Sequence, residues 1–227
     1  MAVVADYLNC AQPRRPTTRA MPFLSLSNIS SVNTVLTDEA GKAQYRVSTP
    51  HQGGTTSISV ALPVALPSSS QDRDLAGYSM DSIPADATLK REETRFVHLA
   101  QISFHESHIK LKSTITFRGE ERVVNDWLRK DGAGKGWWGP HRPFTGSDGK
   151  EYKWLLKANH CELRTNDAAE SMVACFHPRK DRLFSKGKQP ARLELVEGYD
   201  ALRDEIVVTF VFLEHLRGMY DRGEAVA

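Results

Sequence analysis

The stretch LRDEIVVTFVFLEHLR, residues 202–217, contains eight consecutive residues from Ile206 to Leu213 in which Thr209 is the one polar side chain. Val, Ile, Phe and Thr favour strands, so propensity alone allows a buried strand here. A helix is favoured by Asp200 as an N-cap, by acidic residues early and basic residues late, and by Gly218 as a stop. We therefore expect a helix over residues 201–217. Its centre is apolar on every side and has to be surrounded by protein.

Most of the remaining chain shows the alternation of apolar and polar side chains that is typical of half-buried β-strands. Strands are expected within residues 22–28, 41–50, 55–62, 96–104, 109–117, 151–158, 160–164, 171–176 and 191–196. In a mainly β domain, an antiparallel β-barrel closed around the helix would bury this fully apolar terminal helix on all sides, and we expect this fold. Closure also removes exposed strand edges.

The chain of 227 residues fits a single domain with tails. Residues 1–20 are expected to form a disordered tail, and residues 221–227 a second short tail. Residues 63–94 hold three prolines and a triple serine without a sustained period, and predict a disordered insertion in the single barrel domain of residues 21–220. A domain boundary is disfavoured, because the piece before the insertion is too small for its own core.

The net charge is +2, but it is unevenly distributed. Residues 118–192 hold 16 Lys/Arg and 10 Asp/Glu, and residues 193–227 hold 3 and 8. This balance does not indicate nucleic-acid binding. Three scattered cysteines suit a reducing compartment. With no secretory signal or membrane-spanning segment, we expect a cytoplasmic protein, with peripheral membrane or nuclear association as alternatives.

The glycine-rich stretch GAGKGWWGPHRPFTGSDGKEYKW, residues 132–154, resembles a phosphate loop in composition alone. It lacks the required glycine spacing and the following helix. The pair Asp148-Gly149 predicts a hairpin turn instead, followed by an amphipathic strand. In the preceding arm, Trp137 and Trp138 point to opposite faces if the backbone is extended. One of them could lie at the surface beside His141 and Arg142 and meet an anionic ligand. The alternative is that both pack inside the barrel.

Catalytic and metal-binding patterns are weak in this sequence. His160-Cys161 and the Cys175-x-His177 pair could be brought together by a hairpin, and zinc accepts both residue types. Adjacent strand residues face opposite ways, however, and no paired Cys-x-x-Cys occurs. No local signature of a nucleophile and its base is present either. We expect no metal site, no cofactor and no catalytic residues, and we consider an enzyme less probable than a binding protein.

The order of several motifs resembles a fungal family of uncharacterised domains in the tubby C-terminal-like superfamily. This superfamily includes tubby, phospholipid scramblase and plant LURP-one-related proteins. The motifs are SNISSVNTVLTDEAGKAQYRVST (27–49), FRGEERVVNDWLRK (117–130), WWGPHRPFTGSDGKEYKW (137–154) and the terminal stretch. The resemblance implies a barrel around a hydrophobic C-terminal helix and no established activity. Tubby proteins bind phosphoinositides through basic residues, but that motif has no residue-by-residue match here.

The most basic segment, HPRKDRLFSKGKQPAR over residues 177–192, holds six Lys/Arg and one acid between two predicted strands. Each basic residue contributes about 1 kcal/mol near an anionic bilayer. We therefore expect a non-enzymatic binding module that contacts an unknown protein partner or anionic phospholipid. The candidate site residues are Trp137, Trp138, Arg142, Arg179, Lys180, Arg182, Lys186 and Lys188. The alternative for the segment is a solvated loop without a binding role. The alternatives for the protein are a protein–protein interaction module without lipid binding, or a barrel that binds a small ligand.

Overall fold

The computed structural model describes residues 22–50, 54–62, 94–104, 112–136, 139–157, 160–179 and 189–222, and for residues 132–140 it describes the backbone alone. Three predicted segments therefore lie largely or wholly outside the described residues. They are the tail of residues 1–20, the insertion of residues 63–94 and the tail of residues 221–227.

Thirteen strands form one antiparallel sheet in the described part of the chain. They are β1 (Phe23–Leu26), β2 (Thr34–Thr37), β3 (Ala43–Ser48), β4 (Thr55–Ala61), β5 (Phe96–Ser103), β6 (Thr114–Phe117), β7 (Glu120–Val123), β8 (Asp131–Gly136), β9 (Gly139–Thr145), β10 (Glu151–Leu156), β11 (Cys161–Thr165), β12 (Met172–His177) and β13 (Arg192–Leu195). Their order in the sheet is β7-β6-β5-β4-β3-β2-β1-β13-β12-β11-β10-β9-β8. The first strand thus pairs with the last, and this pairing joins the two halves of the chain.

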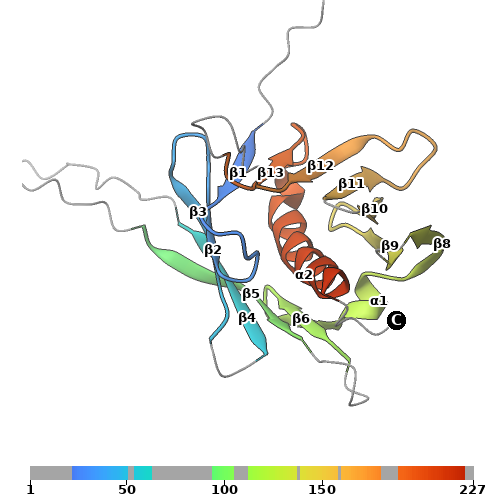
Figure 1. The fold of residues 1–227 in the computed structure, drawn as a ribbon, viewed down its shortest axis with the longest axis horizontal. Helices are drawn as coiled ribbons and strands as arrows, with labels where there is room; N and C mark the ends of the chain where they lie inside the picture. Colours follow the sequence, from blue (N-terminus) through green and yellow to red (C-terminus); the bar gives the residue numbers. More distant parts are fainter. Residues whose placement is uncertain are drawn as a thin grey trace, which may run out of the picture.

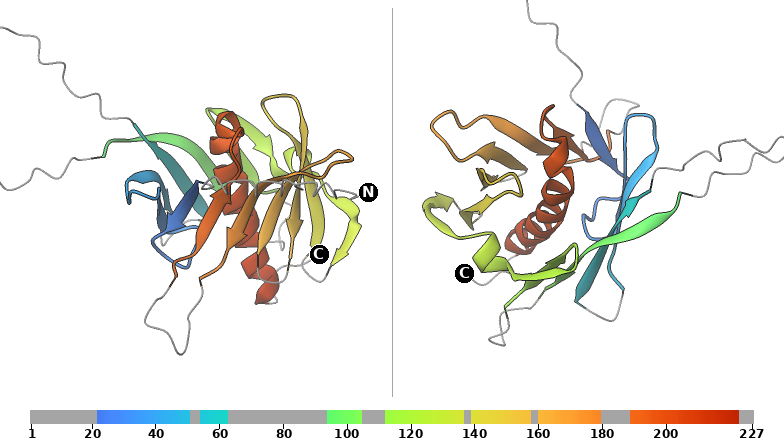
Figure 2. Two further views of the ribbon diagram at one scale, coloured as in Figure 1. Left: turned by 90° about the horizontal axis from the view of Figure 1, so that it is seen from above. Right: turned by 180° about the vertical axis from the view of Figure 1, so that it is seen from behind.

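The C-terminal helix α2 (Arg203–Asp221) lies in the middle of this sheet, which curls around it (Figure 1). A short 3-10 helix, η1 (Asp200–Leu202), leads into α2 from β13. The two further views show strands on opposite sides of the helix (Figure 2). The predicted architecture, a mainly antiparallel β domain wrapped around a hydrophobic C-terminal helix, is confirmed.

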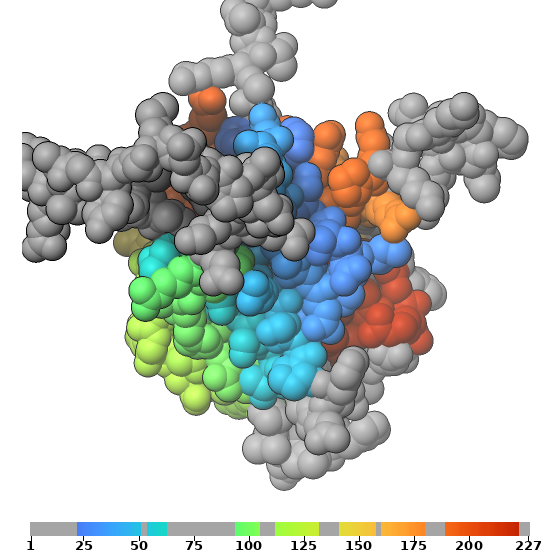
Figure 3. Space-filling view, turned by 90° about the vertical axis from the view of Figure 1, so that its left-hand side faces the viewer, coloured from blue at the N-terminus to red at the C-terminus, as the bar shows by residue number. Residues whose placement is uncertain are grey.

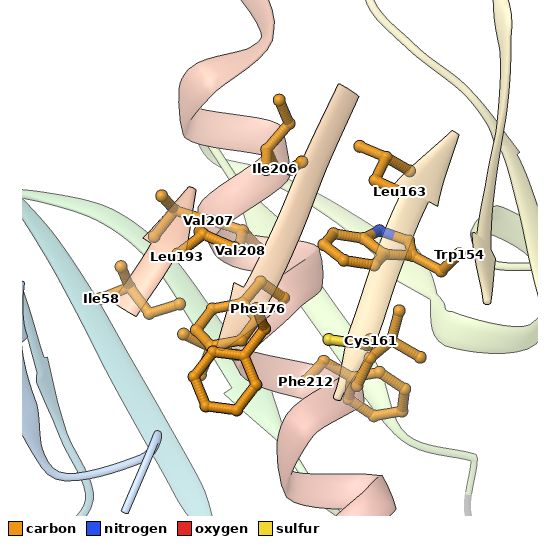
Figure 4. Close-up of a cluster of buried hydrophobic side chains, with 14 of the residues drawn as sticks. Ile58, Trp154, Cys161, Leu163, Phe176, Leu193, Ile206, Val207, Val208 and Phe212 are labelled. Atoms are coloured by element: carbon orange, nitrogen blue, oxygen red, sulfur yellow. The ribbon is translucent and has the colours of Figure 1, made fainter. Parts of the chain in front are cut away.

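The apolar run of the sequence forms the centre of the core. All eight residues from Ile206 to Leu213 are at most 5% exposed. The strands supply the side chains around them by alternation, so that Tyr152, Trp154 and Leu156 of β10 are all buried. Figure 4 shows Trp154 and Phe176 among these side chains beside α2. Burying each large apolar side chain stabilises the fold by about 1.5–3 kcal/mol.

Thr209 is the one polar residue in the buried run, and its hydroxyl is hydrogen-bonded. The hydroxyl donates to the backbone carbonyl of Glu205 at 2.7 Å. It also accepts a hydrogen bond from Nε1 of Trp154 at 3.0 Å. This side-chain bond joins the helix to β10 and fixes how the two elements lie along each other. A buried indole N–H needs such a partner, because an unpaired one costs about 1–3 kcal/mol.

The two end strands of the sheet, β7 and β8, share no ladder among the described residues, so the backbone closure that we predicted is not found. The short helix α1 (Val124–Trp127) connects these strands. Trp127 stacks on Phe117 of β6 at 6.0 Å and meets Phe144 of β9 edge-on at 6.2 Å, measured between ring centroids. Aromatic packing therefore connects β6 to β9 across the place where β7 and β8 do not pair.

Several local predictions are confirmed, and others are corrected. The hairpin at Asp148-Gly149 joins β9 to β10, with Gly149 at a φ of +77° that favours glycine. The predicted helix end at residue 217 is wrong, because Gly218 lies inside α2 and the helix continues to Asp221. No strand was predicted within the glycine-rich residues 132–136, yet they form most of strand β8.

Strands β1 to β7 lie side by side in the N-terminal half of the sheet. Figure 3 shows this half in blue through green, with residues of the C-terminal region, coloured red, reaching the surface at its margin. Residues 215–220 of α2 are half-buried, and the ring of Phe104 lies 4.1 Å from that of His215, centroid to centroid. The helix is therefore fully enclosed at its centre and partly accessible towards its end.

The Trp154–Thr209 bond leads to a testable prediction. Thr209→Val should lower the free energy of unfolding by about 1–3 kcal/mol, because it leaves a buried N–H without an acceptor. In the Trp154→Phe background the same change should cost about 1 kcal/mol less, because that donor is already absent. Urea denaturation of the four proteins measures the coupling.

The control is Trp154→Phe combined with Ile58→Val on β4, for which the two effects should add to within about 0.5 kcal/mol. A zero coupling energy between Trp154 and Thr209 would show that their bond does not stabilise the fold.

Candidate functional site

One end of the sheet carries a small pocket beside the most basic segment of the sequence. The pocket, of about 130 Å³, is lined by Leu26, Ser27, Asn28, Ile29, Arg179, Pro190 and Ala191. We call this set of residues the basic rim. It is formed by the β1–β2 connection and by the two ends of the β12–β13 connection. The backbone N–H of Leu26 donates to the carbonyl of Ala191 at 2.8 Å and ties these connections together.

The basic rim combines an exposed apolar side chain with an exposed cation. Ile29 is 70% exposed, which makes it the most exposed large apolar residue among those that the structure describes. Arg179 is exposed and lines the same pocket. Lys180, Arg182, Lys186 and Lys188 follow it in sequence and lie outside the described residues. Among the described residues, the basic rim therefore combines one exposed large apolar side chain with one cation.

The conformation of the β1–β2 connection is held by its own polar side chains. The Asn28 side-chain amide donates to the carbonyl of Asn33 at 3.0 Å, and the Asn28 backbone N–H donates to the hydroxyl of Thr34 at 3.1 Å. The hydroxyl of Ser27 accepts from the N–H of Val35 at 2.9 Å. These bonds satisfy the polar groups on both sides of Ile29. Its exposed position is therefore part of an ordered turn.

Arg142 lies away from the basic rim, on β9, and its residue is only 3% exposed. The expectation that it lies at a binding surface is therefore wrong. Its Nη1 donates to Oδ1 of Asn125 at 3.1 Å and to the carbonyl of Leu128 at 3.2 Å. Burial lowers the pKa of this guanidinium. Arg142 thus ties β9 to the end of α1. Trp137 and Trp138, the other predicted site residues in this region, lie outside the described residues.

The opposite end of the sheet has a pocket of about 270 Å³ that is lined by Phe117, Arg118, Glu120, Arg122, Thr145, Gly146, Ser147 and Glu205. Its arginines are already paired with acids. Arg118 contacts Asp204 at 2.8 Å, and Arg122 contacts Glu120 at 2.6 Å. These carboxylates offset the positive charge of the two arginines in this pocket.

A third cluster lies on the outer face of β11 and β12. His160, Glu162 and Cys175 present ligand atoms that all lie within 4.8 Å of one another. The sequence pattern pointed to His160-Cys161 and Cys175-x-His177 as pairs that a hairpin could bring together. The structure brings His160 and Cys175 together, whereas His177 contacts Glu194 at 2.5 Å instead. The sequence pattern did not point to Glu162, because a single glutamate in a strand carries no spacing signal. Cys161 faces the core and is fully buried.

Sequence reasoning also missed Ile29. It lies in the polar run SNISS, where a lone apolar residue gives a weak signal. Its significance depends on the pairing of β1 with β13, which brings residues 27–29 beside residues 179 and 190. Such a long-range neighbour relation has no local pattern in the sequence.

The buried position of Arg142 leads to a testable prediction. Arg142→Ala should lower the free energy of unfolding by about 1–3 kcal/mol, because the Leu128 carbonyl loses a buried donor and packing is lost. Lys130→Ala, at an exposed position nearby, should stay within about 0.5 kcal/mol of the parent. Chemical denaturation measures both, and equal stability of the two variants would contradict the structural role.

The comparisons with known proteins identify a family without a known function. A family model described as "Family of unknown function (DUF6593)" matches residues 28–219. No curated protein matches this chain. Among solved structures, the X-ray structure of the Arabidopsis thaliana protein AT5G01750 is similar, with 9% identity and a TM-score of 0.40 over 86% of this chain and 90% of that chain. In the described residues, no helix has the length and apolar character needed to cross a membrane. The family match covers most of the chain and includes all thirteen strands except β1, so this protein belongs to the DUF6593 family.

Proposed function

We propose that this protein is a non-enzymatic binding module that contacts anionic phospholipid headgroups with its basic rim and with the basic residues that follow Arg179. The observation that carries the proposal is the position of Ile29, 70% exposed, in the same pocket lining as Arg179. Ile29 would enter the interface between headgroups and acyl chains. The cations would lie in the plane of the anionic headgroups.

The charge of the neighbouring segment supports this reading. Residues 177–192 hold six Lys/Arg and one acid. At about 1 kcal/mol for each basic residue near an anionic surface, this segment contributes enough for reversible binding. Together with Ile29 it supplies an electrostatic and an apolar contribution. A single weak contribution gives only marginal membrane association.

The filled interior supports a binding function at the outer surface. The α2 residues that face the strands leave the centre of the sheet occupied by protein. A ligand would therefore bind at the ends of the sheet or on its outer face.

The same arrangement of strands around a C-terminal helix supports a further proposal, that this family belongs to the tubby C-terminal-like superfamily. Peripheral association with the cytoplasmic leaflet, which carries anionic lipids, is the location that fits this function.

Co-sedimentation with vesicles tests the proposal. The full chain should pellet with phosphatidylcholine vesicles that contain phosphoinositide and stay in solution with pure phosphatidylcholine. Replacing Arg179, Lys180 and Arg182 by Glu should abolish pelleting, and Ile29→Ser should weaken it by several-fold. Binding should fall as salt is raised, because exposed charges are screened.

The matched control replaces Lys42, Arg95 and Lys150 by Glu, which makes the same change in net charge at exposed positions outside the basic rim. This variant should retain most of the binding. Equal recovery of the parent with both kinds of vesicle, unchanged in the Arg179 variant, would favour a protein-interaction module without a lipid role. If the control variant loses as much vesicle binding as the Arg179 variant, net charge alone explains the effect, and this result would also contradict the proposal.

A further inference from the structure

The outer face of β11 and β12 carries three side chains of the types that bind metal ions, and none of them lines the basic rim pocket. Glu162 and Cys175 lie directly opposite each other in the antiparallel register of the two strands. His160 precedes Glu162 by two residues and lies on the same face. The Nε2 of His160 is 3.0 Å from Oε1 of Glu162. Their ligand atoms, together with Sγ of Cys175, are all within 4.8 Å of one another.

We propose that His160, Glu162 and Cys175 form a binding site for a divalent transition-metal ion, with Zn²⁺ as the best fit. Zinc takes imidazole nitrogen, carboxylate oxygen and thiolate sulfur in tetrahedral geometry. Bonds of about 2.0–2.3 Å separate two such ligands by about 3.3–3.8 Å. Small rotations of the three side chains reach these separations, so the strands need not move. The fourth position faces solvent, where water can complete the tetrahedron.

The hydrogen bonds of Glu162 prepare its carboxylate for this role. Arg164 donates from Nε and Nη2 to Oε2 at 3.1 and 3.0 Å, which fixes the carboxylate plane. Lys157 donates to the other oxygen, Oε1, at 2.6 Å. Burial raises the pKa of the carboxyl, but the hydrogen bonds from Lys157, His160 and Arg164 outweigh it and lower the pKa to about 2. Arg164 thus holds Oε2 of an ionised carboxylate, and Oε1 becomes available to a metal ion when Lys157 turns away.

Lys157 and His160 both contact Oε1 of Glu162, so a metal ion at this oxygen would displace Lys157 and replace the His160–Glu162 hydrogen bond. The side chain of Lys157 is 43% exposed, so it can turn into solvent when the ion takes Oε1. Arg164 can keep its bonds to Oε2 and act as an outer partner that orients the ligand. A purely structural ion-pair network on this face would instead depend on Lys157. The two readings therefore predict opposite effects of removing that lysine.

Two carboxylates lie near Cys175, and the positive charges of Lys157 and Arg164 act on its pKa in the opposite direction. Glu162 faces Cys175 from β11, and Glu194 faces it from β13. Burial, followed by these two negative charges, raises the pKa of the Cys175 thiol to about 11. The thiol is therefore protonated before binding. When the metal–sulfur bond forms, the S–H bond breaks and the proton passes to the solvent. The Nε2 of His160, which now faces the Glu162 carboxylate, binds the metal in the tautomer that carries the ring proton on Nδ1.

Cobalt substitution is the direct test. The full chain, treated with chelator and reductant, should bind one Co²⁺ and show a thiolate-to-cobalt charge-transfer band that Zn²⁺ removes. Cys175→Ser should abolish this band. His160→Ala and Glu162→Gln should each weaken binding at least ~10-fold. Lys157→Gln should strengthen Co²⁺ and Zn²⁺ binding, because it removes both a competing ion pair and a positive charge.

Cys10→Ser and His98→Ala serve as matched controls, because both remove a possible ligand elsewhere in the chain. Both should retain the band and the affinity. Absence of a charge-transfer band in the parent, its persistence in Cys175→Ser, or its loss in Cys10→Ser would overturn the proposal. Weaker metal binding by Lys157→Gln would also overturn it and favour the ion-pair network. If Glu162→Gln fails to fold, the parent titration and the Lys157→Gln comparison still decide the question.

Discussion

The burial of residues 206–213 is the constraint on which the rest of the structure depends. A helix whose circumference is apolar over two turns loses its stabilisation if any side of it meets water. The strands have to surround it, and the alternation of side chains along each strand supplies an apolar inner face for that purpose. The single polar side chain in the run, that of Thr209, accepts a hydrogen bond from Trp154 of strand β10. Within residues 206–213 this bond adds a directional contact to the apolar packing.

The sheet that surrounds α2 is completed by side chains where the backbone does not pair. The aromatic rings of Phe117, Trp127 and Phe144 continue the inner surface from β6 through α1 to β9. Arg142 reinforces the same region by holding the Leu128 carbonyl at the end of α1. Such a junction keeps the helix covered without a strand ladder between β7 and β8. Because the interior is filled, the chemistry that the molecule can offer lies on its rims and its outer face.

The extent to which the sequence predicts this structure depends on how local each signal is. The helix and strand β10 follow from strong local patterns, the apolar run and the alternation of Tyr152, Trp154 and Leu156. The helix end was missed because Gly218 is tolerated inside a helix at a cost of about 1 kcal/mol. Strand β8 was missed because glycines weaken strands and carry no side-chain pattern. Arg142 looked exposed because arginine usually is, whereas tertiary packing buries it. The pairing that brings Ile29 beside Arg179, or Glu162 beside Cys175, is long-range and has no local signature.

Native-state hydrogen exchange of the α2 amides tests most directly whether the sheet is built around the helix. If it is, the amides of residues 206–213 exchange only through global unfolding, with the same free energy as the most protected amides of β10 and β12. The helix and the strands then lose protection together as denaturant is added. Exchange of the α2 amides through a lower-energy opening, with the strands still protected, would show that the sheet is stable without the helix and would contradict the account.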